Sequence, residues 1–341
     1  MISQEKELFT TEVAWIGYDR DGRNSEFRKI AFLGVSGKVF LLPVRGVSEM
    51  TEAGFIGAGT VGTAMAIGLH NHGYRITAVY SRSRESAEKL ASEIPGCRVM
   101  ESSQAVADNV DIVFITTPDG AIGTVVSEID WKPGQSVVHC SGADSTEVLE
   151  PAKQSGALTG AFHPLQTFAS VKQAIENIPG STFAIEAEEP LLTELKKMAT
   201  ALEGRYIQLE ADDKVVYHAA AVMACNYLVT LVKQATDLWK TFDIPTQQAS
   251  QALLPLIQGT IHNIETVGIP DCLTGPIARG DTGTIRKHIE ALEKSAPDVL
   301  PTYLELGRQT VPIALAKGKI TGKQAEDMME ILKQPNLLIS I

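Results

Sequence analysis

The feature that most constrains this chain is a glycine-rich stretch that follows a short apolar run. Residues 54–66 read GFIGAGTVGTAMA, with glycines at the spacing Gly57-x-Gly59-x-x-Gly62. A strand pattern precedes the stretch, a helix pattern of small and apolar residues follows it, and a second strand comes about twenty residues later. This order predicts a β-α-β unit whose turn binds the diphosphate of a dinucleotide. The alternative is a glycine-rich turn that holds no ligand.

Each position of the motif has a physical reason. Gly57 permits the tight turn out of the strand, and Gly59 lacks a Cβ, so a pyrophosphate can approach its backbone. Gly62 lets helix and strand pack closely. Thr60 and Val61 lie in the first turn of the helix, where free N–H groups and the positive end of the dipole favour a diphosphate. We therefore expect these five residues to bind the cofactor.

The end of the second strand distinguishes between the two nicotinamide dinucleotides. NAD-binding proteins usually carry an acidic residue there, which accepts hydrogen bonds from the ribose 2′-hydroxyl. Residues 80–84 read YSRSR and contain no acid. Because arginine and serine bind a 2′-phosphate that a carboxylate would repel, Ser81 and Arg82 predict NADP as the cofactor. The alternative is a solvated loop that merely contains arginines.

Strand and helix patterns alternate after the glycine motif, and the chain then becomes helical. Strands are predicted at residues 54–56, 74–80, 98–100, 110–116, 136–139, 158–161 and 182–186, with helices at 85–94 and 120–129. Further helices are predicted near residues 189–203, 212–241, 246–266, 284–294, 298–317 and 321–333. The alternation predicts an α/β Rossmann domain with a doubly wound, mainly parallel sheet over residues 50–187. A helical C-terminal substrate and dimerisation domain is expected over residues 188–341. Residues 1–49, polar and irregular apart from 38–44, remain an unassigned N-terminal extension.

Composition and charge exclude several classes of function. The 341 residues carry a net charge of −11 and no basic cluster, so neither nucleic acid nor an anionic membrane is an expected partner. The four cysteines are far apart and form no C-x-x-C pair, so neither a disulfide framework nor a metal site is indicated. The polar start, MISQEKELFTTEV, does not resemble a secretory signal, which indicates a cytoplasmic protein.

One motif follows the buried strand predicted at residues 110–116. Thr116, Thr117 and Pro118 leave this strand at the edge of the sheet where ligands bind. The proline stops the strand and directs the chain over the cofactor, so we expect all three residues to contact it. Asp119 is either a polar contact on the nicotinamide side or the N-cap of the next helix, and we expect the cap.

Two more motifs follow predicted strands. In HCSGA, residues 139–143, Ser141 and the N–H groups after it either hold a substrate carboxylate or carbonyl, or form an ordinary Ser/Gly turn. Cys140 is expected to be a packed thiol rather than a nucleophile. In AFHPLQTF, residues 161–168, His163 either donates a proton or holds a substrate oxygen, or is a structural histidine.

The helix predicted near residue 212 carries polar residues on an apolar background. Residues 215–232 lack charge and reach the length of a membrane span, but His218 and Asn226 are costly in lipid. We therefore expect a buried central helix of a soluble protein. Lys214, His218 and Asn226 share one helical face, and polar groups there need partners or a function. Further along, Arg279 in the loop LTGPIARGD either pairs with an acid or reaches an anionic ligand.

The motifs GFIGAGTVG, TTPD, HCSGA, AFHPLQTF, KVVYHAAAVMACNY and LTGPIARGD occur in this order in one family. The chain resembles the Rossmann-like proteins whose C-terminal half is domain of unknown function 2520. More distantly it is similar to pyrroline-5-carboxylate reductase and β-hydroxyacid dehydrogenases. This resemblance implies an all-α C-terminal domain of the 6-phosphogluconate dehydrogenase-like type, which dimerises and closes over the nicotinamide. A Lys and an Asn four residues apart serve β-hydroxyacid dehydrogenases, whereas here His218 follows Lys214 at that spacing and Asn226 comes later.

The expected function is that of an NADP-dependent reductase or dehydrogenase that transfers hydride to a small carbonyl or imine. The resemblance keeps a keto acid such as ketopantoate among the candidate substrates. Lys214, His218, Asn226, His163 and Ser141 are the candidate catalytic residues. A homodimer through the C-terminal helices is expected, because a helix of about 30 residues spans about 45 Å, more than one small domain can easily bury. The alternative is a non-catalytic NADP-binding or sensor protein.

Overall fold

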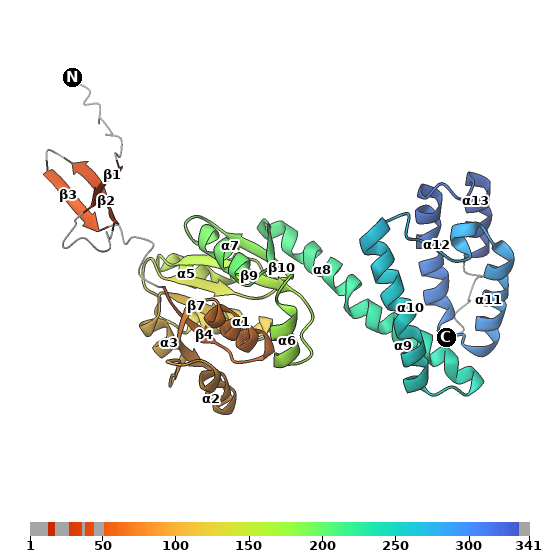
Figure 1. Cartoon of the computed structure of the whole chain (residues 1–341), viewed down its shortest axis with the longest axis horizontal. Helices are drawn as coiled ribbons and strands as arrows, with labels where there is room; N and C mark the ends of the chain where they lie inside the picture. The colour runs from red at the N-terminus through yellow and green to blue at the C-terminus, as the bar shows by residue number, and fades with distance from the viewer. Residues whose placement is uncertain (1–12, 18–26, 36–37, 44–50, 334–341) are drawn as a thin grey trace, which may run out of the picture. The chain divides into compact units, whose positions relative to one another are not determined.

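The computed structural model describes residues 13–17, 27–35, 38–43 and 51–333 (Figure 1). The chain divides into two compact units, Met1–Ala220 and Ala221–Ile341. The first unit contains the glycine motif and the second consists of helices. The sequence placed a domain boundary near residue 187, and the first compact unit also includes the segment that follows that residue.

The centre of the first unit is an eight-stranded sheet with the order β11-β10-β9-β8-β7-β4-β5-β6. All neighbouring strands run parallel except β9 and β10, which are antiparallel. The strands are β4 (Glu52–Ile56), β5 (Arg75–Tyr80), β6 (Arg98–Val99), β7 (Ile112–Ile115), β8 (Ser136–His139), β9 (Leu158–Leu165), β10 (Thr182–Ala187) and β11 (Arg205–Gln208). The carboxyl ends of β4, β5, β7, β8 and β9 therefore share one edge of the sheet.

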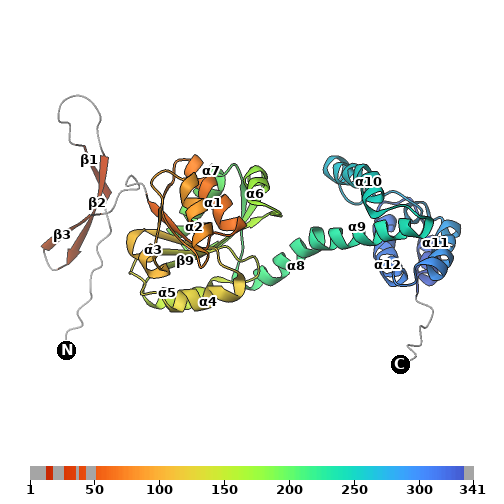
Figure 2. The same ribbon diagram turned by 90° about the horizontal axis from the view of Figure 1, so that it is seen from below.

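Helices cover both faces of this sheet, as Figure 2 shows. One apolar core joins the sheet to α1 (Thr60–Asn71), α2 (Arg84–Glu93), α6 (Val171–Asn177) and α7 (Leu191–Ala201). A second core on the opposite face includes α3 (Ser103–Asn109), α4 (Asp119–Ser127) and α5 (Glu150–Gln154). The predicted doubly wound, mainly parallel Rossmann sheet is thus confirmed.

Aromatic side chains help to fix the alignment of the central strands. Phe55 on β4 stacks on Phe114 of β7 with ring centroids 5.0 Å apart. Phe162 on β9 stacks on Phe183 of β10 at 4.6 Å. All four rings are fully buried, so a slip of one residue in any of these strands would turn a large apolar ring toward the other face.

The helices after the sheet agree closely with the predicted ranges. They are α8 (Lys214–Ala224), α9 (Asn226–Trp239), α10 (Thr246–Val267), α11 (Thr282–Ser295), α12 (Leu300–Ala316) and α13 (Gly322–Ile331). Apolar residues of α11, α12 and α13 form the core of the second unit. The predicted helical C-terminal region is therefore confirmed.

Two expectations about secondary structure were wrong. Strand β11 follows the point from which the chain was expected to be almost wholly helical. Its four residues, RYIQ, are all exposed, so only backbone pairing with β10 defines the strand and no apolar pattern marks it. The N-terminal segment, expected to be irregular apart from residues 38–44, contains a three-stranded antiparallel sheet of β1 (Val13–Gly17), β2 (Phe27–Val35) and β3 (Lys38–Pro43).

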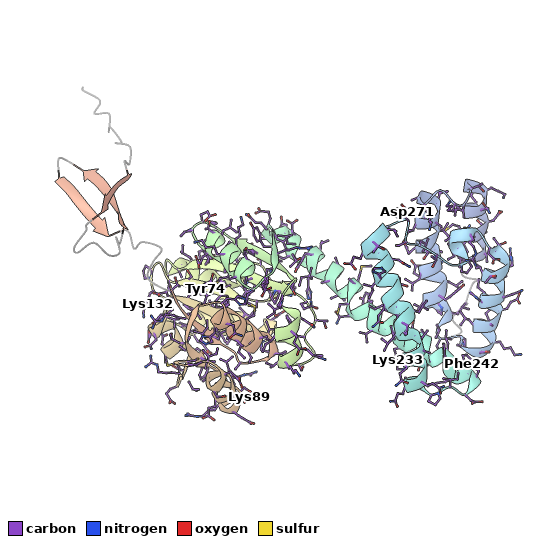
Figure 3. The ribbon with its side chains drawn as sticks, in the orientation of Figure 1. Tyr74, Lys89, Lys132, Lys233, Phe242 and Asp271 are labelled. Atoms are coloured by element: carbon purple, nitrogen blue, oxygen red, sulfur yellow. The ribbon has the colours of Figure 1, made fainter. Side chains whose placement is uncertain are left out.

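The expectation of a buried central helix was also wrong. Residues Ala211–Phe242 are long and apolar enough to cross a membrane by length and composition alone, which is weak support for a span. The apolar part of this stretch is not buried by the described residues of the chain. Val216 is 73% exposed and Val229 68% exposed, and Phe242, marked in Figure 3, is exposed as well. Apolar side chains of this stretch are therefore exposed in the described structure.

Candidate functional site

The glycine turn between β4 and α1 is fixed by close backbone packing. Gly57 has a φ of +110°, and a Cβ there would lie 2.7 Å from the carbonyl carbon and oxygen of Thr116. A Cβ on Gly62 would collide with the Thr116 hydroxyl and lie 2.6 Å from the Gly57 oxygen. Both positions therefore require glycine for the fold itself.

Gly59 has no such packing reason to be glycine. Apart from Gly59 itself and its chain neighbours, no atom of the described residues lies within 4 Å of the position that a Cβ on Gly59 would take. Gly59 is also the N-cap of α1, and it offers no side chain to the free N–H groups of the first turn, which includes Thr60 and Val61. An open space thus faces an uncapped helix N-terminus, as a bound phosphate group requires.

The two threonines after β7, Thr116 and Thr117, have different roles. The Thr116 hydroxyl donates to the Gly57 carbonyl at 2.8 Å and so holds the glycine turn. The Thr117 hydroxyl is buried and has no hydrogen-bond partner among the described residues. A buried hydroxyl without a partner is rare in proteins, so Thr117 is well suited to a ligand at this edge.

The expectation that Asp119 caps the helix was wrong. Pro118 occupies the N-cap position of α4, and Asp119 is the first helical residue. Proline holds an extended backbone here, with φ −53° and ψ 143°, and the helix begins directly after it. The Asp119 carboxylate lies in the first turn, where the helix dipole favours a negative charge.

The end of β5 lies next to the glycine turn, because the Gly57 N–H donates to the Tyr80 carbonyl at 2.8 Å. Ser81 and Arg82 follow directly. Arg82 is exposed and forms no ion pair with any residue that the structure describes, whereas Arg84 binds Glu88 at 2.9 Å. Of the two arginines in the motif, Arg82 is therefore the one whose charge is available to a ligand.

Ser141 forms a tight turn after β8. Its hydroxyl accepts hydrogen bonds from the N–H groups of Ala143 at 3.3 Å and Asp144 at 3.0 Å. Its own N–H donates to Nδ1 of His139 at 3.1 Å, so the His139 proton is on Nε2, which donates to the Ser145 carbonyl at 3.2 Å. The structure thus shows the Ser/Gly turn, and these two N–H groups are already bound.

The same turn receives a buried cation from α8. The Lys214 Nζ donates to the Ser141 carbonyl at 3.0 Å, and Lys214 is only 1% exposed. Burial lowers the pKa of Lys214, while the carboxylate of Glu186 acts in the opposite direction. Burial, followed by the charge of Lys214, lowers the pKa of His139 to about 3. Burial raises the pKa of Cys140 to about 12, so its thiol is protonated, in agreement with a packed thiol.

Two histidines approach this turn at Gly142. A Cβ on Gly142 would lie 2.7 Å from Cδ2 of His218 and 2.9 Å from Nε2 of His163, so no side chain fits between the two rings. The ring centroids of His163 and His218 are 6.1 Å apart. Nδ1 of His163 forms a hydrogen bond with the Tyr217 hydroxyl at 2.8 Å. Burial, with Lys214 and His218 contributing, lowers the pKa of His163 to about 4.

The sequence suggested that His163 lies on a loop after a strand. In the structure it lies within strand β9. It pairs with Ala184 in the antiparallel ladder of β9 and β10. His139, the last residue of β8, pairs with Ala161, so β9 continues past the end of β8. This extra length carries His163 beyond the edge of the parallel strands and toward Ser141. The proline at position 164 argues against such a continuation, because proline is disfavoured in the interior of a sheet.

Asn226 does not share a continuous helix with Lys214 and His218, which corrects the predicted common face. The helix is interrupted at Cys225, whose φ of −111° and ψ of −66° depart from helical values. Asn226 opens α9 in the second compact unit and is exposed. The structure thus brings Lys214, His218, His163 and Ser141 together within the first unit.

The LTGPIARGD loop lies in the second unit. Asp281 is the N-cap of α11 and accepts from the Thr284 N–H at 3.0 Å, so its carboxylate acts in the fold. These hydrogen bonds from Thr284, with a smaller contribution from the charge of Arg279, lower the pKa of Asp281. Arg279 is exposed, and its side chain makes no hydrogen bond or ion pair within the described part of the chain.

The sequence did not single out Tyr217 or Gly142. Tyr217 stands three residues after Lys214, on the same side of the helix, and this i, i+3 spacing was a usable signal. Gly142 had no signal of its own, because the space it leaves is created by histidines from a distant strand and helix.

A cavity of about 810 Å³ lies away from this site. It is at the amino ends of the strands, and Tyr74, marked in Figure 3, is part of its wall. Two basic residues of its wall are bound to carboxylates, since Arg75 binds Glu52 at 2.7 Å and Lys197 binds Glu194 at 3.2 Å. Dinucleotides bind at the opposite, carboxyl edge of such sheets. The candidate site is therefore identified by its side chains at that edge and not by the volume of a cavity. No group of three metal-ligating side chains occurs among the described residues.

Comparison with known proteins agrees with this architecture. Residues 47–164 match the Rossmann-like domain, and residues 181–310 match domain of unknown function 2520. A solved structure from Bacteroides fragilis, of a protein proposed to be an NADP oxidoreductase, is 26% identical, with a TM-score of 0.62 over 77% of this chain and 98% of that one. No curated protein gives a significant match.

Two more distant structures share the fold. A reductive aminase from Aspergillus terreus, solved with NADPH and ethyl-5-oxohexanoate, is 15% identical, with a TM-score of 0.54 over 83% of this chain and 92% of that one. A pyrroline-5-carboxylate reductase from Coxiella burnetii is 17% identical, with a TM-score of 0.53 over 82% of this chain and 99% of that one. The two-part architecture inferred from the motifs is confirmed.

Proposed function

We propose that this chain, which belongs to the proteins that join a Rossmann-like domain to domain of unknown function 2520, is an NADP-dependent reductase or dehydrogenase of a small carbonyl or imine. One observation carries the proposal. A buried lysine and two histidines meet beside Ser141, at the same edge of the sheet as the glycine turn. A protein that only held the dinucleotide would have no need to bury a charged lysine there.

The residues at this edge fit NADP. The diphosphate would be held by the turn and first helical residues Gly57, Gly59, Thr60, Val61 and Gly62, where the open space beside Gly59 faces an uncapped helix N-terminus. Ser81 and the unpaired Arg82 would bind the 2′-phosphate. Thr116 supports the turn, while the unpartnered Thr117 hydroxyl and Pro118 would face the cofactor. When bound, NADPH supplies the hydride.

The side chains around Ser141 would supply the proton and the charge stabilisation that the reduction needs besides the hydride. Reduction of a C=O or C=N bond also needs a proton and a group that stabilises charge on the oxygen or nitrogen. Lys214 is a cation whose pKa is lowered by burial, which makes its ammonium a better acid. His218 is the second candidate, because its imidazole lies beside Gly142 at the same turn and can donate a proton. Either group would deliver a proton from the side of α8.

The buried cation also favours a substrate with a negatively charged end. A keto acid such as ketopantoate, or an imine that carries a carboxylate, would suit it. Purified protein should be incubated with NADPH and a panel of keto acids, amino ketones and cyclic imines, and NADPH oxidation followed by absorbance. Turnover of any member supports the enzyme. Tight NADPH binding without turnover of any member would favour the non-catalytic NADP-binding or sensor protein.

We also propose a cytoplasmic homodimer that forms through the C-terminal helices. The apolar residues of α8, α9 and α10 support it, since Val216, Val229 and Leu256 are each more than half exposed. A second copy presents the same apolar surface and would cover this one symmetrically. Burial in a dimer also explains the apolar stretch without placing His218 and Asn226 in lipid.

A further inference from the structure

The hydrogen bond between Tyr217 and His163 has no counterpart in the function proposed above. The Tyr217 hydroxyl lies 2.8 Å from Nδ1 of His163, and the two rings meet edge to face with centroids 5.7 Å apart. Tyr217 comes from α8 and His163 from β9, so this bond joins the two elements that bring polar groups to the Gly142 turn.

The second nitrogen of His163 is free at the same time. Nε2 of His163 has no hydrogen-bond partner among residues 51–333. It is not fully buried, so solvent can reach it. It lies on the side of Gly142, where a Cβ would approach it to 2.9 Å. The absence of a side chain at Gly142 therefore keeps Nε2 accessible.

The relative acidities of the two groups decide where the protons lie. Both groups are neutral near pH 7, because burial raises the pKa of Tyr217 to about 12 and lowers the pKa of His163 to about 4. A phenol is a more acidic donor than a neutral imidazole N–H, and an imidazole nitrogen is a more basic acceptor than a phenol oxygen. The stable arrangement has the Tyr217 O–H donating to Nδ1, which leaves the single imidazole proton on Nε2.

We propose that Tyr217 is a positioning residue that holds His163 as the tautomer whose Nε2–H donates a hydrogen bond to the substrate's carbonyl oxygen or imine nitrogen beside Gly142. The role of the substrate rests on the proposed reductase function, whereas the tautomer does not. A neutral imidazole can polarise a C=O or C=N bond without giving up its proton. The proton that completes the reduction then comes from another group, Lys214 or His218.

The tautomer can be measured without a substrate. The full-length protein labelled with ¹⁵N-histidine contains seven histidines, and comparison with His163→Gln assigns the His163 signals. Long-range ¹H–¹⁵N spectra show directly which ring nitrogen carries the proton. We expect a protonated Nε2 and an unprotonated, hydrogen-bonded Nδ1 for His163 in the wild-type protein at neutral pH. A proton on Nδ1 would overturn the proposal, and this result requires no variant to fold.

Tyr217→Phe then tests the cause. It should shift the His163 nitrogen signals toward a mixture of the two tautomers. The chain offers a matched control in the second unit, where Tyr303 Oη lies 2.9 Å from Nδ1 of His288 with ring centroids 5.8 Å apart. Tyr303→Phe should change the His288 signals and leave those of His163 in place. Identical His163 signals in wild type and Tyr217→Phe would show that Tyr217 does not set the tautomer.

Kinetics separate this role from simple structural support. With any substrate found by the panel, Tyr217→Phe should lower kcat about tenfold, the size of one hydrogen bond in the transition state, with little change in the affinity for NADPH. An unchanged kcat would contradict the substrate part of the proposal. A panel without turnover would count against the reductase function, while the tautomer would still be decided by the spectra.

Discussion

The Lys214 Nζ donates a hydrogen bond to the main-chain carbonyl of Ser141 at 3.0 Å, which joins the start of α8 to the turn after β8. Lys214 is the one lysine, arginine or carboxylate residue that is buried among residues 51–333. A buried ammonium is costly unless it is well paired, and a carbonyl oxygen is a neutral partner. Such a residue is seldom kept for stability, and this is why we place chemistry at this point.

The glycine turn gives a prediction in which two neighbouring glycines behave differently. Gly57→Ala should destabilise the fold by about 2 kcal/mol or more, because it places a Cβ at positive φ and against the Thr116 carbonyl. Gly59→Ala should change the free energy of unfolding by less than about 0.5 kcal/mol, because its Cβ enters open space. The same change should weaken NADPH at least about tenfold by occupying the phosphate site. Urea unfolding and fluorescence titration test both effects, and full NADPH affinity in Gly59→Ala would contradict the placement of the diphosphate.

The second prediction concerns the cofactor phosphate. Arg82→Ala should weaken NADPH binding by about 1.5–3 kcal/mol, the range for a hydrogen bond to a charged group, and should leave NADH binding nearly unchanged. Arg84→Ala is the matched control, because the Arg84 side chain already binds Glu88. Titration of each variant with both cofactors is the measurement. Equal weakening of NADPH and NADH by Arg82→Ala would mean that Arg82 has another role.

Local periodicity was enough to predict the sheet and the helices. The apolar run of the buried strand β7 and the spacing of the glycine motif are local sequence signals, so they predicted the Rossmann unit directly. Strand β11 was not, because its residues are exposed and only its neighbour defines it. An edge strand of this kind has no apolar alternation to detect.

The candidate site was predictable in its residue types but not in its contacts. Lys214 and His218 stood out as polar residues four apart on an apolar background. Their meeting with His163 depends on how far β9 extends past β8, and strand register between distant segments leaves no local trace. Asn226 was grouped with them because its spacing fits one continuous helix, but the backbone departs from a helix at Cys225, and the residue types do not show this departure.

The buried histidines make the fold sensitive to acid. The pKa of His139 is lowered to about 3 and that of His163 to about 4, below the usual value of 6.5, so the unfolded chain binds protons first as the pH falls. Their contribution is present above pH 6.5 and is lost as the pH falls toward the folded values. Between pH 7 and pH 4.5 each should remove on the order of 2 kcal/mol from the free energy of unfolding.

The variant His139→Asn tests this acid sensitivity. Its amide oxygen can replace Nδ1 as the acceptor from Ser141 while removing the titration. Urea unfolding at pH 7 and pH 4.5 should therefore show a smaller loss of stability in the variant than in the wild type. The same loss in both proteins would show that other groups, such as the carboxylates, are responsible.

The fourth prediction concerns the exposed apolar helices. Light scattering at micromolar concentration should give the mass of a dimer. Val216→Asp should shift the equilibrium toward the monomer, because it places a charge in the proposed interface at a position that is 73% exposed in the single chain. Lys89→Asp on α2 is the control, since Lys89 is exposed and lies far from α8 in sequence. A wild-type monomer would exclude the homodimer, and a dimer unaffected by Val216→Asp would move the interface elsewhere.

The last prediction places the proton transfer on α8. Lys214→Met keeps the length and apolar stem of the side chain but removes the ammonium that binds the Ser141 carbonyl. His218→Gln keeps a hydrogen-bonding side chain beside Gly142 but removes the imidazole. Both variants should remain folded and bind NADPH, because neither residue contacts the glycine turn in the described structure.

Turnover of the substrate found by the panel should fall by at least about 100-fold in the variant that has lost the general acid. The pH profile of kcat identifies the donor, since loss of the acid removes the corresponding limb of the profile. His163 is a poorer candidate, because with a pKa of about 4 it is neutral at the pH where the reaction would run. If both variants turn over at the wild-type rate, the assignment to α8 is wrong, and His163→Gln becomes the decisive variant, because His163 is then the remaining imidazole beside Gly142.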